Sequence, residues 1–361
     1  MKLNSIPSML SRLVRFPSGK TENSRGIKRL EKFRYSQALF GRREILKGFA
    51  ILPLAGALIP SVLARKKWVS YEENNLMDRM AGIRIKGSGL LPAEAIKIPM
   101  AKIGKEKFSR VILGGNLIGG WAHARDLLYV SQLVKTYFTD EKVFETFALA
   151  EKYGINAFLT NPVLCRVINE YWKRDLGKIK FISDCGGNTL TEGIQVSIDH
   201  GACACYVHGG MADDLVARGK VEEIGKALDL IRRNGLPAGI GGHNLKTVQA
   251  CADFGLKPDF WMKTLHKTDY WSANIENQND NIWCTDPQGT VEFMKNRKEP
   301  WIAYKTLAAG AIEPKVGVQY AFEKGADFVC VGMFDFQIAE DLKIMSDILG
   351  SEIRRDRPWM A

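Results

Sequence analysis

The sequence predicts a (β/α)8 barrel, an α/β fold also called a TIM barrel, preceded by an N-terminal signal segment and a linker. Eight short, almost continuously apolar segments are each followed by a segment whose apolar residues have helical spacing. Hydrophobic residues make up 46% of the chain and charged residues 25%, which excludes a disordered protein. A doubly wound parallel sheet is the alternative that the same alternation allows.

The expected strands and helices alternate along the chain. The eight expected strands cover residues 110–113, 157–160, 180–183, 202–207, 238–241, 260–265, 301–304 and 328–331. The expected helices cover residues 141–152, 163–172, 190–199, 221–233, 245–254, 288–295, 314–324 and 338–349. Gly154, Gly235 and Gly325 end helices, because glycine readily takes the positive φ of a helix C-terminus. A hairpin within residues 97–108 would close the bottom of the barrel.

Positive charge is concentrated at the N-terminus. The chain has a formal net charge of +11, from 51 Lys and Arg against 40 Asp and Glu. Residues 1–64 alone contain 12 Lys and Arg and 3 Asp and Glu, a net charge of +9, which leaves +2 for residues 65–361. Because the folded region is nearly neutral, no nucleic acid is expected as a partner.

An arginine pair precedes an apolar run near the N-terminus. Residues 41–47 read GRREILK, and the run covers residues 49–63. The arrangement resembles a twin-arginine (Tat) signal, which implies the Tat translocon as a partner and export to the periplasm. Since a span needs roughly 20 apolar residues, we expect membrane contact only during export or through an uncleaved signal. The expected regions are the signal with its long basic leader (1–64), a linker (65–96) and the barrel domain (97–361).

Polar residues that follow consecutive expected strands form the candidate site. His208, His243 and His266 come directly after three neighbouring strands, and Asp184 follows the strand before them. These strand ends share one rim of a (β/α)8 barrel, so we expect the four side chains to converge as catalytic groups. Three imidazoles and a carboxylate also suit a divalent metal (Zn, Mn, Fe or Co) with one position open for water or substrate. Metal-free acid–base catalysis or substrate recognition, and purely structural roles, are the alternatives.

Three further features border the expected site. Asn116 and its neighbouring glycines follow the first strand, and they either bring backbone close to a ligand or form a tight turn. Lys305 follows the seventh strand, and its side chain either pairs with a carboxylate or points into the helix layer. The long loop after the sixth strand carries Tyr270, Trp271 and Trp283, which either stack on sugar rings or pack the loop onto the barrel.

The chain contains seven cysteines and no CxxC pair, which excludes a zinc ribbon. Cys203 and Cys205 lie two residues apart on an expected strand, so regular alternation places both on one face. Neighbours on one strand suit burial in a core better than a disulfide.

The order of segments resembles the aldo/keto reductase superfamily over residues 97–349. The motifs that carry the resemblance are Val111-Ile112-Leu113-Gly114, Ala150-Glu151-Lys152-Tyr153-Gly154-Ile155-Asn156, Tyr206-Val207-His208, Ala303-Tyr304-Lys305-Thr306-Leu307 and Gln337-Ile338-Ala339-Glu340-Asp341. The resemblance implies His208 as an active-site histidine. It also implies NADP as a cofactor, held in part by Asn244, Tyr304 and Glu340.

The sequence departs from the family's pattern at the reacting end. Thr160-Asn161-Pro162 stands where the proton-donor tyrosine and its aspartate are expected, and Asp184 lies where the lysine is expected. Gln337 replaces the arginine that grips the 2′-phosphate. Because hydride transfer to a carbonyl needs a proton relay, a different reaction on the same fold is expected.

Three functions are compatible with these residues. The first is an exported lyase, isomerase or hydrolase that acts on a carbohydrate or related polyhydroxy carbonyl compound. It would use the Asp184, His208, His243 and His266 cluster, with or without a metal. The second is a divergent NADP-dependent oxidoreductase of the aldo/keto reductase type. The third is a non-catalytic sugar-binding barrel.

Overall fold

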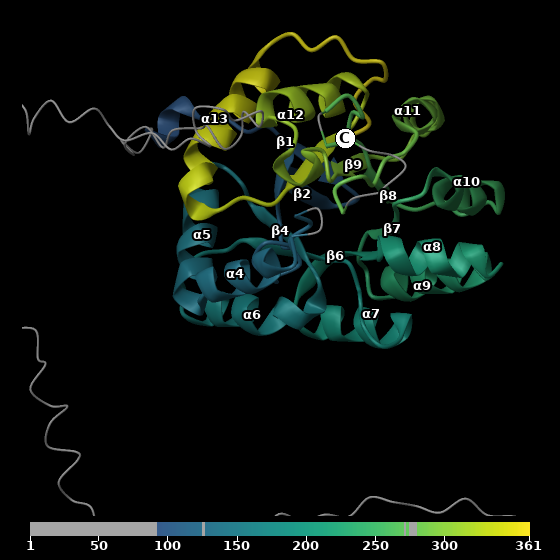
Figure 1. The fold of residues 1–361 in the computed structure, drawn as a ribbon. Coiled ribbons are helices and arrows are strands. Elements are labelled where there is room, and N and C mark those ends of the chain that lie inside the picture. The colour runs from purple at the N-terminus through teal and green to yellow at the C-terminus, as the bar shows by residue number, and fades with distance from the viewer. Residues whose placement is uncertain (1–91, 125–126, 271, 274–279) are drawn as a thin grey trace, which may run out of the picture. The chain divides into compact units, whose positions relative to one another are not determined.

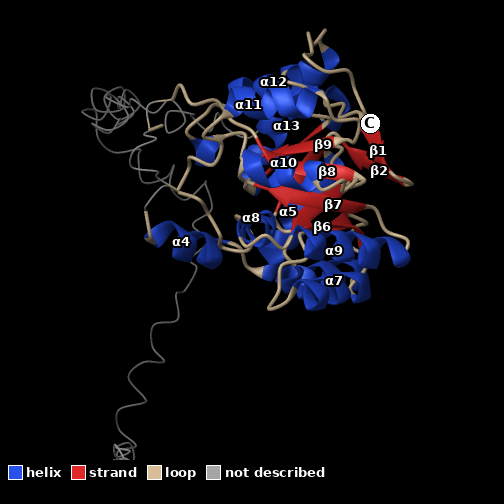
Figure 2. Cartoon of the chain, turned by 90° about the vertical axis from the view of Figure 1, so that its right-hand side faces the viewer, coloured by secondary structure: helices blue, strands red, loops and turns tan. Residues whose placement is uncertain are grey.

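The computed structural model describes residues 92–361 apart from 125–126, 271 and 274–279. Within this part of the chain, eight parallel strands close into a barrel in the order β10-β3-β4-β5-β6-β7-β8-β9, which confirms the predicted (β/α)8 fold (Figure 1). Helices surround the strands, as Figure 2 shows. The predicted signal segment and most of the predicted linker lie outside the described residues.

Each barrel strand coincides with an expected strand to within one residue at either end. The strands are β3 (Val111–Gly114), β4 (Ala157–Thr160), β5 (Lys180–Ser183), β6 (Ala202–Val207), β7 (Ala238–Gly242), β8 (Phe260–Thr264), β9 (Trp301–Tyr304) and β10 (Phe328–Val331). The barrel closes where β10 pairs with β3, with Val329 opposite Val111. Side chains fill the inside and helices cover the outside, so both faces of each strand are buried, which explains the nearly continuous apolar segments.

The helices expected from spacing are all present. They are α5 (Asp140–Lys152), α6 (Cys165–Lys173), α7 (Leu190–Asp199), α9 (Val221–Arg233), α10 (Leu245–Asp253), α11 (Pro287–Lys295), α12 (Pro314–Glu323) and α13 (Asp335–Gly350). Short 3-10 turns occur at η3 (Ala93–Ala95), η4 (Pro162–Leu164) and η5 (Ala308–Gly310). Two further helices, α4 (Tyr129–Tyr137) and α8 (Gly209–Ala217), are not predicted by the spacing. None of the helices in the described ranges has the length and apolar content needed to cross a membrane.

The predicted hairpin closes one end of the barrel. Strands β1 (Met100–Ile103) and β2 (Glu106–Ser109) pair antiparallel. Ile103 and Phe108 are buried in the cluster of side chains that fills the barrel interior. The hairpin therefore plugs the end at which the strands begin, and the opposite end is left for a site.

The two cysteines of β6 lie on different faces, so the prediction that they share one is wrong. Cys205 belongs to the cluster between strands and helices, whereas Cys203 packs against the barrel interior. The cause is a register shift in the pairing of β5 with β6, between Phe181 and Ile182. A β-bulge of this kind adds one residue to a strand and reverses the alternation beyond it.

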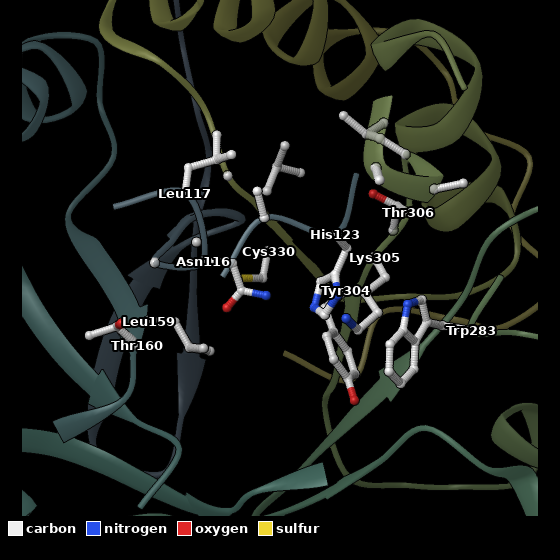
Figure 3. Close-up of a pocket in the computed structure, with 18 of the residues that line it drawn as sticks. Asn116, Leu117, His123, Leu159, Thr160, Trp283, Tyr304, Lys305, Thr306 and Cys330 are labelled. Carbon is white, nitrogen blue, oxygen red and sulfur yellow. The ribbon is translucent and has the colours of Figure 1, made fainter. Parts of the chain in front are cut away.

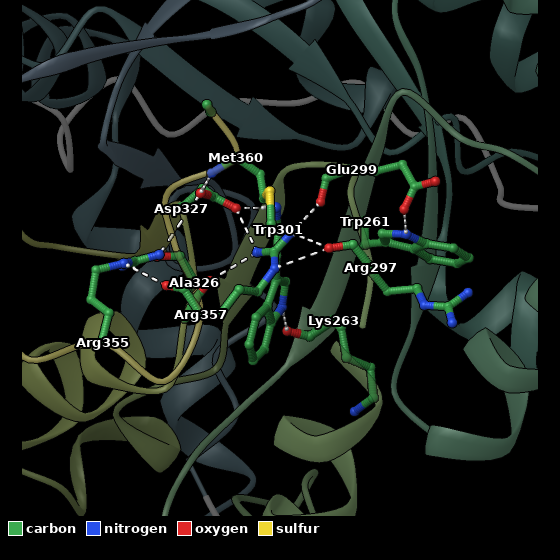
Figure 4. A network of polar contacts seen from close by, with 12 residues as sticks. Trp261, Lys263, Arg297, Glu299, Trp301, Ala326, Asp327, Arg355, Arg357 and Met360 are labelled. Carbon is green, nitrogen blue, oxygen red and sulfur yellow. Dashed lines mark hydrogen bonds and ion pairs between the residues drawn. The ribbon is translucent and has the colours of Figure 1, made fainter. Parts of the chain in front are cut away.

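The C-terminal segment is fastened to the same end as the hairpin (Figure 4). The Arg357 guanidinium is 1% exposed and donates to Asp327 Oδ2 at 2.8 Å. It also donates to the backbone carbonyls of Gly325, Arg297 and Glu299. Asp327 in turn accepts hydrogen bonds from the backbone N–H groups of Trp301 and Met360. This buried ion pair therefore ties the starts of β9 and β10 to the end of the chain.

Candidate functional site

A cavity of about 620 Å³ opens at the carboxyl ends of the strands. Its walls come from the loops after the strands. The polar side chains on them are those of Asn116, His123, Thr160, Asp184, Tyr206, His208, Asp213, His243, Trp283, Tyr304, Lys305, Thr306, Gln337 and Asp341. Figure 3 shows His123, Tyr304, Lys305 and Trp283 gathered on one side, with Leu159 and Thr160 across from them. Volume and lining suit a small polar molecule.

Asp213, on α8, holds the imidazole of His243 in one orientation. Its carboxylate accepts a hydrogen bond from His243 Nδ1 at 2.9 Å and one from Thr247 Oγ1 at 2.6 Å. It also accepts from the backbone N–H groups of His243 and Asn244. With Nδ1 engaged, the other ring nitrogen, Nε2, is left for a ligand in the cavity.

The pKa values of this pair favour an anionic Asp213 beside a neutral His243. Burial acts to raise the pKa of Asp213, but the hydrogen bonds from His243 and Thr247 outweigh it and lower that pKa. Burial lowers the pKa of His243 from its ordinary 6.5, and the hydrogen bond to Asp213 opposes the effect only in part. An imidazole in this state is a base near neutral pH.

A second carboxyl and imidazole lie beside this pair. Asp184 follows β5, and it accepts hydrogen bonds from Gly186 N at 2.8 Å and Asn161 Nδ2 at 3.0 Å. Burial nevertheless raises its pKa, against the opposing charge of His208. The His208 ring lies 6.3 Å from the ring of His243. The structure thus brings Asp184, His208 and His243 to one cavity, as the sequence predicts.

His266 does not join them, which corrects the expectation that four side chains converge. Its ring is fully buried and is absent from the cavity wall. Nδ1 donates to the carbonyl of Lys267, and Nε2 accepts from the backbone N–H groups of Trp283 and Cys284. Both ring nitrogens are therefore engaged in holding the long loop that carries Trp283.

The donor set does not fit the predicted metal. Among the residues that the structure describes, no group of three or more His, Cys, Asp or Glu side chains is placed to hold a metal ion. The Asp184 carboxylate accepts hydrogen bonds from Asn161 and Gly186, and the Asp213 carboxylate accepts one from His243. Neither carboxylate is therefore arranged as a metal ligand. We derive no step through a metal.

Trp283 forms one wall of the reacting end. Its ring lies 4.7 Å from the ring of His243 and 5.1 Å from that of His123. Of the other aromatic side chains of this loop, Tyr270 donates to the carbonyl of Asn281 and packs the loop, and Trp271 lies outside the described residues. Of the two that the structure describes, Trp283 is the one on the cavity wall.

Three buried polar atoms of residues that border the cavity have no hydrogen-bond partner among the described residues. They are Thr160 Oγ1, Thr306 Oγ1 and Trp283 Nε1. A buried polar group without a partner costs about 1–3 kcal/mol.

The residues present fit NADP poorly. Glu340 is exposed on α13 and is not part of the cavity wall, and Asn244 contacts Asp213 through its backbone. Gln337 Oε1 accepts from the backbone N–H of Phe334, so it caps α13. Lys305 is the single basic residue, Lys or Arg, among the described residues of the cavity wall, and it lies beside His123 and His243. Tyr304 does line the cavity, but nothing on the wall matches the 2′-phosphate of NADP, so we derive no step through this cofactor.

Sequence reasoning missed Asp213 and misjudged Lys305. Asp213 lies five residues after His208, on helix α8, which the spacing does not predict. A helix that begins directly after His208 would have placed Asp213 near the rim, and this was the available signal. Lys305 takes neither expected arrangement, because its Nζ lies 4.1 Å from the centre of the Trp283 ring and the side chain lines the cavity.

Barrel and cavity together define an α/β barrel protein with an aldo/keto reductase-like fold. Two solved structures assigned as aldo-keto reductases from Pseudomonas aeruginosa match with a TM-score of 0.50. The first is 15% identical and covers 70% of this chain and 94% of its own. The second is 14% identical and covers 70% of this chain and 99% of its own. An aldo-keto reductase from a deep-sea metagenome library matches with a TM-score of 0.44 and 12% identity, over 71% of this chain and 97% of its own.

No protein-family model and no curated protein matches this sequence. At such low identity the solved structures show a shared fold and no shared reaction. The reaction is therefore argued from the residues of this cavity.

Proposed function

We propose that this chain is an enzyme that moves a proton beside the carbonyl group of a polyhydroxy carbonyl compound, in an isomerase- or lyase-type reaction. The observation that carries the proposal is the Asp213–His243 pair, in which a carboxylate with four hydrogen-bond donors fixes a neutral imidazole at a cavity wall. A histidine held in this way is suited to general acid–base catalysis.

His243 acts as the base that takes the proton from the carbon next to the carbonyl. The raised pKa of Asp184 favours its protonated form, which can return a proton to the substrate with His208 beside it. Burial raises the pKa of Tyr304 well above 10.0, so its hydroxyl stays protonated and can donate a hydrogen bond to the carbonyl oxygen.

The substrate class follows from the polar and aromatic side chains of the cavity wall. The wall carries the indole of Trp283 together with the amide of Asn116 and the hydroxyl of Tyr304. An indole face and scattered hydroxyl or N–H groups are a typical surface for a sugar-like molecule.

We extend the proposal to location: the Tat-like segment favours export to the periplasm, with the translocon as a partner.

One set of measurements separates this function from its alternatives. The protein is incubated in D2O with a panel of aldoses, ketoses and short hydroxy ketones, and α-hydrogen exchange is followed by NMR. We expect exchange in at least one compound. Oxidation of NADPH without such exchange would favour the reductase, and a rise in Tm without turnover would favour a sugar-binding barrel.

Gly209, the first residue of α8, tests the geometry of the pair. A Cβ at this position would lie 2.7 Å from Tyr304 Oη and 2.8 Å from His243 Cε1, so Gly209→Ala must displace one of them. We expect the exchange rate to fall about 10²-fold, because a shift of about 1 Å at a reacting group has this effect. The melting temperature should stay close to that of the wild type, since alanine forms helices more readily than glycine. Gly350→Ala in α13 meets open space and is the control; equal exchange rates in both variants would contradict the assigned roles.

A further inference from the structure

Lys305 places an amine in the cavity that the proposed proton transfer does not use. It follows β9 directly, and its backbone lies in the left-handed region with a φ of 58°. That conformation costs a residue other than glycine about 1–3 kcal/mol, and such residues cluster at active sites. The turn after it is fixed by a hydrogen bond from Ala308 N to the Lys305 carbonyl at 3.1 Å.

No carboxylate of the residues that the structure describes holds the amine. Within the described part of the chain, Lys305 Nζ forms no ion pair, and it lies 4.1 Å from the centre of the Trp283 ring. Asp280, the carboxylate that acts on it electrostatically, lies within 3.1 Å of His123 Nδ1 and pairs with that ring. A lysine whose purpose was a structural ion pair would be expected to have such a partner.

The charge state agrees with this geometry. Burial lowers the pKa of Lys305 to about 7, with the charge of Asp280 opposing the shift. The groups coupled to it electrostatically are Asp280, His123, His243 and His266. An amine that is neutral for a substantial share of the time at pH 7 is a nucleophile, whereas an ordinary lysine is almost entirely protonated.

Lys263 shows what a purely structural buried lysine looks like in the same barrel. It is 1% exposed, and burial lowers its pKa to about 8. Its Nζ, however, donates to the carbonyls of His243 and Thr264 and to Thr264 Oγ1. Lys263 is fully engaged and lies outside the cavity wall, so burial alone does not make an available amine.

We propose that Lys305 captures the carbonyl group of the substrate as an imine. This inference rests on the proposed function and narrows its substrate to an aldehyde or ketone whose carbonyl carbon reaches Nζ. In the first step the Nζ lone pair bonds to the carbonyl carbon, the carbonyl π bond breaks and the oxygen takes a proton. In the second step nitrogen loses a proton and the hydroxyl leaves as water, which leaves a carbon–nitrogen double bond. No oxidant or reductant takes part.

The neighbouring groups suit both steps. His243 packs on the same indole as Lys305 and can pass a proton between nitrogen and oxygen. A protonated imine withdraws electrons more strongly than a carbonyl, so it acidifies the adjacent C–H that His243 removes. The imine therefore supplies the activation that a metal or another electrophile would supply elsewhere.

Reductive trapping tests the inference on the intact protein. Wild-type protein is incubated at pH 7 with dihydroxyacetone or glyceraldehyde and sodium cyanoborohydride, and the modified lysines are located by peptide mass spectrometry. We expect Lys305 to be modified at least about tenfold faster than the exposed Lys102, because far more of its amine is neutral at this pH. Lys263 in the same sample should stay unmodified and serves as the internal control for burial.

The pH dependence of trapping gives a second readout. Modification of Lys305 should rise through pH 7 and then level off, whereas modification of the lysine in a short reference peptide should keep rising toward pH 10. Modification of Lys305 that is no faster than that of Lys102 would overturn the proposal, as would an equal rate at Lys263.

The two proposals can fail separately. α-Hydrogen exchange that survives in Lys305→Met but is lost in His243→Gln would keep the proton-transfer function and remove the imine. Trapping at Lys305 without α-hydrogen exchange in any compound of the panel would keep the imine and remove the proton transfer.

Discussion

Replacing His243 with glutamine should lower the rate of α-hydrogen exchange by about 10²–10⁴-fold, the usual contribution of a general acid–base group. Glutamine keeps a polar side chain at the end of β7 but cannot take a proton. Asp213→Asn should lower the rate as well, since an amide no longer requires Nδ1 of His243 to be the donor and so releases the tautomer. Exchange rates are measured by NMR in D2O on variants with unchanged far-ultraviolet circular dichroism.

The pH dependence of the exchange rate also tests the assignment of His243 as the base. Because burial lowers the pKa of His243 below 6.5, the imidazole is already neutral at pH 7. The contribution of His243 to the rate should therefore be complete at pH 7 and be lost only in more acidic solution, where His243 becomes protonated. Lys246→Ala, on the exposed first turn of α10, is the matched control and should keep the wild-type rate. A His243→Gln rate within about threefold of wild type would contradict the assignment.

Arg357→Met should lower the free energy of unfolding by about 3–5 kcal/mol, because it removes the guanidinium nearest the buried Asp327 and leaves that carboxylate only the longer ion pair with Arg355, at 3.8 Å. Both side chains of the Arg357–Asp327 pair are fully buried. The backbone carbonyls of Gly325, Arg297 and Glu299 also lose a donor (Figure 4). Methionine keeps much of the volume, so the loss measures the charge and hydrogen bonds more than a cavity.

Urea unfolding followed by circular dichroism measures this effect. Arg354→Ala, three residues earlier in the same segment and exposed, is the control and should change the free energy of unfolding by less than about 0.5 kcal/mol. A loss below about 1 kcal/mol in Arg357→Met would show that the C-terminal segment does not hold the barrel closed.

The barrel could be predicted from sequence because buried parallel strands are apolar on both faces. All eight strands were found to within one residue for this reason. Helix α8 escaped detection because it begins with Gly209 and Gly210, which are poor helix formers, and buries few side chains. The bulge between β5 and β6 also escaped, since an extra residue in one strand leaves no mark on composition.

The site was predicted in part, and the errors have a common physical cause. A position after a strand places a residue on the rim but does not say where its side chain points. His208, His243 and Asp184 point into the cavity, whereas the backbone of the loop folds over His266 and engages both of its nitrogens. Asp213, the partner of His243, lies on α8, which follows the preceding strand, β6. Tertiary packing brings these two side chains together, and the sequence pattern does not show that contact.

The most direct test is the time course of α-hydrogen exchange in D2O for the most reactive compound of the panel, with EDTA present and without nucleotide. Wild-type protein and His243→Gln are compared at equal concentrations of folded protein. Exchange that is fast in wild type and slower by about 10²-fold or more in the variant is the predicted result. Exchange that is absent from wild type across the panel, or equal in the two proteins, would contradict the account.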